Sequence, residues 1–206
     1  TITDDSAVGG QIIQGSTIFN SAAISNLKRS LSSGSNRKTF TISTWVKRGI
    51  LGGSKTLFNA YDQMGVLYSS KGDLLALDYF NAALRLQPYR YDIHYKVGMF
   101  YQSLQTFDEA VQAYERALAL KKDHKISLHN IAVIEVFRKN YNSAIDYFTQ
   151  AIMVDNSYVE AYFGRAYCYE LIGDLVKSES DYRTSLILDA KYIPSRKGMD
   201  RINGVQ

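Results

Sequence analysis

A spacing of 34 residues organises the chain between Tyr91 and Asp155. The order of small, large and aromatic residues in the first half of this stretch recurs in the second half, 34 positions later. The paired positions are Val97 and Ile131, Gly98 and Ala132, Tyr101 and Glu135, Phe107 and Tyr141, Ala110 and Ala144, Tyr114 and Phe148, Ala117 and Ala151, and Leu120 and Val154. A fixed period of this size is typical of a solenoid in which pairs of helices stack on one another.

The same order of residues continues on both sides of this stretch. Small residues recur at the eighth, twentieth and twenty-seventh positions of each period, and an aromatic residue recurs at the twenty-fourth. This pattern resembles the tetratricopeptide repeat, in which small residues allow two antiparallel helices to approach closely. Glu135 stands where the family usually has an aromatic residue, and we expect weaker packing there.

The resemblance implies an all-α fold over residues 57–206. We expect a right-handed superhelical solenoid of four helix pairs, followed by a C-terminal capping helix with a polar outer face. The expected repeats are 57–90, 91–124, 125–158 and 159–192, with the cap helix at 192–203. The expected helices lie near 58–70, 73–86, 91–104, 107–120, 125–138, 141–154, 159–172 and 175–188.

Residues 1–56 have a different composition and form a predicted N-terminal leader. The stretch 38–46 alternates apolar and polar residues, which indicates a β-strand. Gly52-Gly53 is predicted to form a turn, and residues 56–58 are predicted to begin a second strand or the first helix. The run resembles the start of a laminin-G or concanavalin-like sandwich, although a whole sandwich needs a longer chain. The open alternatives are a partly disordered segment with a short hairpin, a hairpin docked on the first helices, a sugar-binding module, and a segment that does not belong naturally with the repeats.

Charge and composition narrow the classes of partner. Residues 1–56 hold seven Lys or Arg residues against two Asp residues, while the remaining chain holds 17 basic and 18 acidic residues. Because the repeats show no basic stripe, we expect no nucleic-acid partner. No apolar run is long enough to span a membrane, and Cys168 is the single cysteine. The sequence does not indicate a cellular compartment.

The first helix of each predicted pair faces the concave groove of the solenoid in the family that the chain resembles. Apolar side chains at these positions are not needed for packing between the two helices of a pair, so we expect them to contact a partner. Chaperone-tail adaptors of this family use Lys and Asn where Asp62 and Val66 stand, which argues against that class. The predicted partner-binding residues are Tyr95, Lys96, Met99, His129, Asn130, Val133, Phe137, Phe163, Tyr167, Glu170 and Leu171.

Few residues suggest catalysis or cofactor binding. The stretch 49–56 nearly matches a phosphate-binding loop, but Ser54 replaces the glycine that must precede the lysine. His94, His124 and His129 do not have the spacing of a metal site, and we expect Cys168 to be a small buried side chain. We therefore expect no catalytic, cofactor or metal site.

These observations predict a non-enzymatic scaffold that binds a peptide segment or a partner protein in its concave groove. One alternative is a glycan-binding cell-surface or phage-type adhesion protein, in which only the N-terminal segment would contact glycan. A second alternative is the regulatory domain of a larger enzyme.

Overall fold

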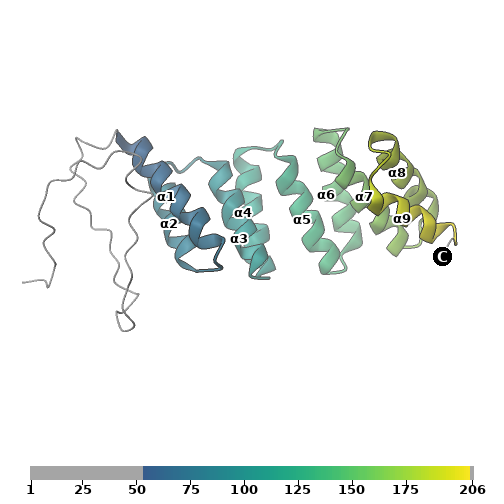
Figure 1. The fold of residues 1–206 in the computed structure, drawn as a ribbon, viewed down its shortest axis with the longest axis horizontal. Helices are drawn as coiled ribbons and strands as arrows, with labels where there is room; N and C mark the ends of the chain where they lie inside the picture. Colours follow the sequence, from purple (N-terminus) through teal and green to yellow (C-terminus); the bar gives the residue numbers. More distant parts are fainter. Residues whose placement is uncertain (1–52, 205–206) are drawn as a thin grey trace, which may run out of the picture. The chain divides into compact units, whose positions relative to one another are not determined.

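The computed structural model describes residues 53–204, and within this range the chain forms nine α-helices and no β-strand (Figure 1). The helices follow one another in a row in chain order. Their bounds are α1 (Gly53–Ser69), α2 (Leu75–Leu86), α3 (Tyr91–Ser103), α4 (Phe107–Leu120), α5 (Lys125–Phe137), α6 (Tyr141–Val154), α7 (Val159–Leu171), α8 (Leu175–Leu188) and α9 (Ile193–Ile202).

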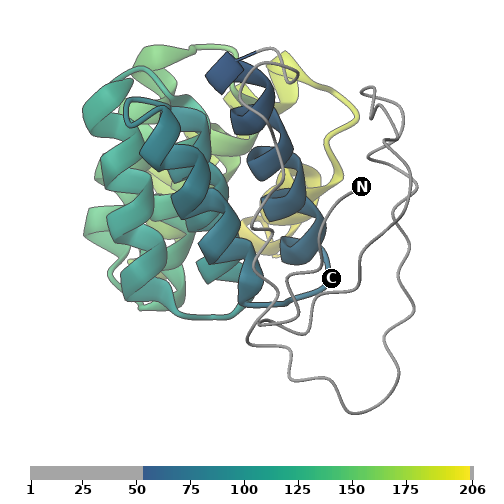
Figure 2. The same cartoon turned by 90° about the vertical axis from the view of Figure 1, so that its left-hand side faces the viewer.

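The helices form four pairs, α1 with α2, α3 with α4, α5 with α6 and α7 with α8, and α9 packs against the last pair. This arrangement confirms the predicted all-α solenoid of four helix pairs with a C-terminal capping helix. Figure 2 looks along the row and shows that successive pairs are displaced around a common axis, so that the row of helices curves. Contacts between α1 and α3, between α5 and α7 and between α7 and α9 join the first helices of neighbouring pairs.

The predicted helix bounds agree with the structure to within two residues, except at the start of α1. That helix begins at Gly53 rather than at residue 58, so the predicted turn at Gly53 is wrong and residues 56–58 are helical. The predicted strand at 38–46 and the glycan-binding alternative concern residues outside the described range. The division between residues 56 and 57 falls within α1, and the division of the chain into domains stays a prediction.

The two helices of each pair are joined by the same turn, built around one residue in the left-handed region. These residues are Gly72, Gln105, Lys139 and Gly173, with φ between 60° and 84°. The following residue donates its backbone N–H to a carbonyl in the last turn of the first helix, as Thr106 does to Tyr101 and Asp174 does to Tyr169. The repeated turn reverses the chain in the same way four times, so every pair is antiparallel.

The contact between the helices of a pair is centred on one buried aromatic side chain from the second helix. These side chains are Phe80, Tyr114, Phe148 and Tyr182, each at most 1% exposed. The rings of Phe80 and Tyr114 lie against a glycine in the first helix of the same pair, and the rings of Phe148 and Tyr182 lie against a glycine in the helix that follows. At Gly164 a Cβ atom would stand 2.3 Å from Cζ of Phe148. Since real Cβ atoms do not approach that closely, the absence of a side chain at Gly164 sets how near α7 lies to α6.

Glu135 occupies the position that the sequence pattern reserves for an aromatic residue, and it is 8% exposed. Its carboxylate accepts hydrogen bonds from Arg138 Nη1 at 3.0 Å and from Asn140 Nδ2 at 2.8 Å. Arg138 also forms an ion pair with Asp108 at the start of α4. Polar contacts therefore replace aromatic packing at this point and connect the end of α5 to α4.

A partly buried ion pair joins the two helices of the fourth pair, and its arginine also donates a hydrogen bond to the third pair. The Arg165 guanidinium on α7 donates to both carboxylate oxygens of Asp181 on α8, at 2.7 and 2.8 Å, and to Oγ1 of Thr149 on α6 at 3.1 Å. The side chains of Arg165 and Asp181 are 19% and 9% exposed. In the other three pairs, the position of Arg165 is held by the apolar residues Met64, Val97 and Ile131.

Removing one partner of this pair is expected to destabilise the solenoid. Arg165→Ala leaves the Asp181 carboxylate without its counter-charge, and we expect a loss of about 3 kcal/mol in the free energy of unfolding, measured by urea titration. The double variant Arg165→Met with Asp181→Ala introduces residues found at these positions in the other pairs. It should be more stable than Arg165→Ala, and a double variant less stable than that single variant would contradict the prediction.

Candidate partner-binding groove

An open hollow of about 470 Å³ lies between the first helices of the second and third pairs. It is lined by Tyr95, Met99, Gln102 and Ser103 of α3 and by Asn130 of α5. Contacts between α3 and α5 are sparser than those that join the other neighbouring first helices, which leaves room for the hollow. The structure therefore brings together three of the predicted partner-binding residues, namely Tyr95, Met99 and Asn130.

A buried tyrosine, Tyr114, is hydrogen-bonded to two of the residues that line this hollow. The Tyr114 hydroxyl donates to Oε1 of Gln102 at 2.6 Å and accepts from Nδ2 of Asn130 at 3.1 Å. Burial raises the pKa of Tyr114 well above its ordinary value, so the phenol stays protonated at neutral pH. The bonds link α3 to α5 through a side chain of α4, and they occupy the amide oxygen of Gln102.

Aromatic side chains continue from this hollow along the first helices as three similar groups, which we call the aromatic ladder. In each group a ring on a first helix contacts two others: the buried ring of the second helix of its pair, and a ring in the turn before the next first helix. The ring centroids are between 5.0 and 6.0 Å apart. The groups are Tyr114–Tyr95–His124, Phe148–His129–Tyr158 and Tyr182–Phe163–Tyr192.

Sequence reasoning identified only part of the aromatic ladder. Tyr95, His129 and Phe163 were predicted to face the groove, whereas the turn residues that contact them were not. The missed residues are His124, Tyr158 and Tyr192. They are spaced 34 residues apart, and each stands directly before the first residue of a helix, namely α5, α7 and α9. Their periodicity was the signal that could have identified them.

Ion pairs lie at the two ends of the aromatic ladder. At one end, Lys96 Nζ contacts both carboxylate oxygens of Asp62, at 2.5 and 2.7 Å. At the other, the Arg201 guanidinium of α9 donates to both oxygens of Glu170 at 2.8 Å each. The structure shows Lys96 and Glu170 each in an ion pair within the protein, and their contact with a partner stays a prediction.

The Tyr182 hydroxyl joins the second of these ion pairs. It donates to Oε2 of Glu170 at 2.6 Å and accepts from Arg201 at 3.2 Å. The hydrogen bond from Arg201, followed by that from Tyr182, holds the pKa of Glu170 below its ordinary value, in spite of burial. The capping helix therefore supplies the cation that pairs with Glu170, which the sequence did not indicate.

The remaining predicted residues lie in different surroundings. Phe137 is 69% exposed and its ring stacks on Phe107 of α4 at 5.9 Å. Tyr167 stacks on Phe163 at 6.4 Å, and Leu171 is 41% exposed at the end of α7. Val133 is half-buried and packs against the core of the third and fourth pairs. Of these, Tyr167 belongs with the aromatic ladder, and Phe137 and Leu171 lie beyond it at the ends of their helices.

The cysteine and two of the histidines are enclosed by neighbouring side chains. Cys168 is fully buried, as expected, and burial raises the pKa of its thiol to about 12. His124 Nδ1 shares a hydrogen bond of 2.8 Å with Ser127 Oγ, and burial lowers the pKa of His124 and of His129. Within residues 53–204, no group of three or more His, Cys, Asp or Glu side chains could hold a metal ion.

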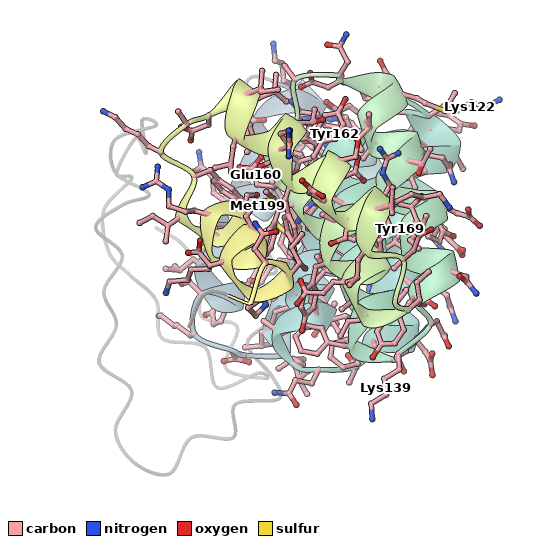
Figure 3. The ribbon with its side chains drawn as sticks, turned by 90° about the vertical axis from the view of Figure 1, so that its right-hand side faces the viewer. Lys122, Lys139, Glu160, Tyr162, Tyr169 and Met199 are labelled. Carbon is pink, nitrogen blue, oxygen red and sulfur yellow. The ribbon has the colours of Figure 1, made fainter. Side chains whose placement is uncertain are left out.

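Exposed positive charge lies at the turns. Lys122 and Lys139 stand in turns at opposite ends of the helices and point outward in Figure 3.

The part of the chain that the structure describes contains no helix that is both long enough and apolar enough to cross a membrane. The near-match to a phosphate-binding loop continues as helix, because Gly53 and the residues up to Thr56 form the start of α1.

Comparisons with known proteins agree with the helical solenoid. Two family models described as tetratricopeptide repeat match residues 89–157 and 131–193. No curated protein sequence matches the chain.

The chain is similar in fold to several solved structures. MamA from Desulfovibrio magneticus RS-1 is 17% identical with a TM-score of 0.65, over 72% of this chain and 84% of that one. YrrB, described as a TPR protein with an unusual peptide-binding site, is 21% identical with a TM-score of 0.59, over 70% and 75%. The first TPR of Spaghetti (RPAP3), bound to the HSP90 peptide SRMEEVD, is 19% identical with a TM-score of 0.54, over 55% and 90%. At these identities the likeness concerns the fold.

The ion pair of Glu170 predicts a pH dependence of stability. Because the pKa of Glu170 is lowered in the folded state, its contribution is full above the unfolded pKa of about 4.3 and is lost as pH falls through the folded value. The difference in unfolding free energy between the wild type and Glu170→Gln should therefore be larger at pH 7 than at pH 3 in urea titrations. Glu179→Gln, which removes a more exposed helix pair with Arg183, is the control. A difference for Glu170→Gln that does not change with pH would contradict the prediction.

Proposed function

Because residues 89–193 belong to the tetratricopeptide repeat family, we propose that the protein is a non-enzymatic scaffold. It binds a peptide segment or a partner protein in the groove along α3, α5 and α7. The observation that carries this proposal is the hollow between α3 and α5. Its floor offers apolar surface beside amide groups, a combination that favours a peptide, whose backbone is polar and whose side chains are mixed.

Met99 is the most informative residue of the hollow. It is 47% exposed, although its neighbours Gly98 and Phe100 are buried in the contacts between helices. An exposed methionine beside aromatic side chains contributes apolar area and adapts to the shape of a partner. Tyr95 adds a rigid ring that keeps its conformation, because it is held between Tyr114 and His124.

Charge supports a partner recognised mainly by apolar contact. Lys96 is neutralised by Asp62, and Glu170 by Arg201. A partner charge that approached either pair would have to compete with an ion pair already formed. Apolar burial and neutral hydrogen bonds are therefore the main source of affinity in this proposal.

The residues of the groove also distinguish this proposal from a chaperone-tail adaptor. The structure of the first TPR of Spaghetti (RPAP3) contains an HSP90 peptide that ends in acidic residues. At the positions where such adaptors bind a carboxylate, this chain has Asp62, which forms an ion pair with Lys96, and Val66, which is 47% exposed. Asp62 would repel a carboxylate, so this function is not favoured.

The non-enzymatic character is part of the proposal. The side chains that are the usual nucleophiles and bases lie in packing roles here. Cys168 is enclosed in the core of the third and fourth pairs, and His129 lies between the rings of Phe148 and Tyr158. Among residues 53–204, neither side chain has a partner that would activate it for catalysis.

A charged group placed in the hollow should abolish binding. Met99→Glu introduces a carboxylate at an exposed position, so we expect an intact fold and a loss of affinity of at least about tenfold for peptides selected on the wild type from a random library. Met153→Glu is the matched control, because Met153 is 81% exposed on α6, away from the hollow. Equal effects of the two substitutions, or none, would exclude the groove as the binding site.

Binding should depend weakly on ionic strength. Because Lys96 and Glu170 already form ion pairs, we expect the Kd of selected peptides to change less than about twofold between roughly 0.05 and 0.5 M NaCl. Fluorescence polarisation at several salt concentrations measures this change. A loss of more than about tenfold would show that unpaired charges carry the affinity and would contradict the assignment.

A further inference from the structure

We propose that Glu160 and the aromatic side chains beside it bind an arginine side chain of the peptide or partner protein that occupies the groove. This inference rests on the proposed function, since it names a residue that the partner carries. It uses three observations: a carboxylate without a partner among residues 53–204, the rings that lie near it, and an arginine that the second helix pair holds in a comparable way.

Glu160 is an exposed residue in the first turn of α7 (Figure 3). Within residues 53–204, its carboxylate forms no ion pair and no hydrogen bond. The positive groups of the neighbouring helices already have acidic partners. These ion pairs are Arg165 with Asp181, Arg201 with Glu170 and Lys125 with Asp155. Glu160 is therefore a negative charge that the described part of the chain does not balance.

Aromatic side chains lie near this carboxylate. Burial raises the pKa of Tyr158 and of Tyr192, and the charge of Glu160 raises both further. The same charge opposes the lowering of the pKa of His129 by burial. Phe163 follows Glu160 by three residues on the same face of α7, and its ring contacts that of Tyr192 at 5.8 Å. A cation that binds the carboxylate therefore meets aromatic rings beside it.

The second helix pair shows what such a group can bind. Asp92 stands two periods of 34 residues before Glu160. Arg90 donates to both carboxylate oxygens of Asp92, at 2.8 and 2.7 Å, and its guanidinium lies 4.4 Å from the centroid of the Phe58 ring. In the fourth pair, Tyr158 stands at the position of Arg90. The arginine that neutralises the acidic residue of the second pair thus has no counterpart in the fourth, and a partner can supply it.

Tyr192 offers the ring on which the guanidinium of the partner can stack. Tyr158 already lies beside a cation, since Lys125 Nζ is 4.9 Å from the centroid of its ring. Tyr192 is half-buried, and among residues 53–204 its ring contacts Phe163 alone and has no cation over it. The charge of Lys125 is balanced by Asp155, so the group as a whole keeps one negative charge.

Arginine suits this site better than lysine does. Its guanidinium is planar, so it can donate to both oxygens of a carboxylate and stack on an aromatic face at the same time. It is also more weakly hydrated than an ammonium group, so it loses less hydration when it enters a groove lined with rings.

The site lies within reach of a peptide that occupies the hollow. Tyr95 lines the hollow, and after burial and Glu160 it is the next group that raises the pKa of Tyr158. The helices α5 and α7 are also in contact. One peptide can therefore place an apolar residue beside Met99 and an arginine beside Glu160. Apolar contact then supplies most of the affinity, and the arginine supplies specificity, because a single exposed ion pair adds little affinity.

A peptide selection tests the inference. A random peptide library is selected in parallel on the whole chain, on Glu160→Gln and on Glu115→Gln. Glu115→Gln is the matched control, because Glu115 is also exposed and forms no ion pair among the described residues, but lies on α4 and acts on Tyr147 of α6. We expect arginine to be enriched at one position of the peptides selected on the wild type and on Glu115→Gln, and not on Glu160→Gln.

A selected peptide then measures the contact. Replacing its arginine by citrulline, which keeps the shape and removes the charge, should raise the Kd by about tenfold on the wild type and by at most about threefold on Glu160→Gln. Fluorescence polarisation measures both changes.

Tyr192→Ala should weaken binding of the arginine peptide by about threefold, because it removes the ring under the guanidinium. Tyr89→Ala is the matched control, since Tyr89 is 83% exposed in the turn before α3. Circular dichroism confirms that each variant keeps its helical content. Glu160 is exposed, so Glu160→Gln tests the site without disturbing the core.

Several results would overturn the inference. They are an enrichment of arginine that persists on Glu160→Gln, or an effect of citrulline that is the same on both proteins. Selected ligands that are sensitive to Met99→Glu but lack arginine would overturn the inference and uphold the scaffold function. A library that yields no ligand sensitive to Met99→Glu would contradict the scaffold function itself, and the inference with it.

Discussion

The fold depends on the contact between one buried aromatic ring of each second helix and a neighbouring helix that has no side chain at the point of contact. At Gly164, a Cβ atom would overlap the ring of Phe148, and Gly198 stands in the same relation to Tyr182. These two contacts hold α7 close to α6 and α9 close to α8. The close approach of these helices contributes to the way that successive pairs stack in the row.

The buried ring is a tyrosine where hydrogen-bonding side chains surround it and a phenylalanine where they do not. Tyr114 has Gln102 and Asn130 within hydrogen-bonding distance, and Tyr182 has Glu170 and Arg201. Around Phe148, the residues equivalent to Gln102 and Asn130 are Val136 and Gly164, which form no side-chain hydrogen bonds. A buried hydroxyl requires a partner, so the polar and apolar parts of the groove alternate with the identity of the ring beneath them.

The 34-residue period made most of the helical solenoid predictable, because small residues at fixed positions determine which helix faces can touch. The period could not reveal interactions that break the repeat. Arg165 and Asp181 stand at positions that are apolar or aromatic in other pairs, and only the folded structure brings them together. The start of α1 was misplaced because glycine is common in turns, and Gly53 nevertheless lies at a helix end, where it costs little.

The groove was predicted less completely than the helices, for a physical reason. Helical spacing shows that Lys96 and Glu170 lie on the groove side, but not that Asp62 and Arg201, in neighbouring helices, would neutralise them. The distinction between an exposed charge and a paired one requires distances across 31 to 34 residues of chain. Likewise, the turn residues His124, Tyr158 and Tyr192 become part of the aromatic ladder only when each turn folds back against the preceding first helix.

A surface that repeats along its length has approximate translational symmetry. A ligand whose own repeat has the same length as the spacing between neighbouring aromatic groups can therefore bind in more than one position. Such a ligand meets nearly the same surroundings after it slides by one step, so several registers of similar energy coexist. The aromatic groups alone would therefore fix the orientation of a ligand more firmly than its position along the groove. The symmetry is broken at the two ends, where Asp62 with Lys96 and Glu170 with Arg201 replace the aromatic rings, and by His129 in the middle group. These departures from the repeat are the features that can define where a bound chain begins and ends.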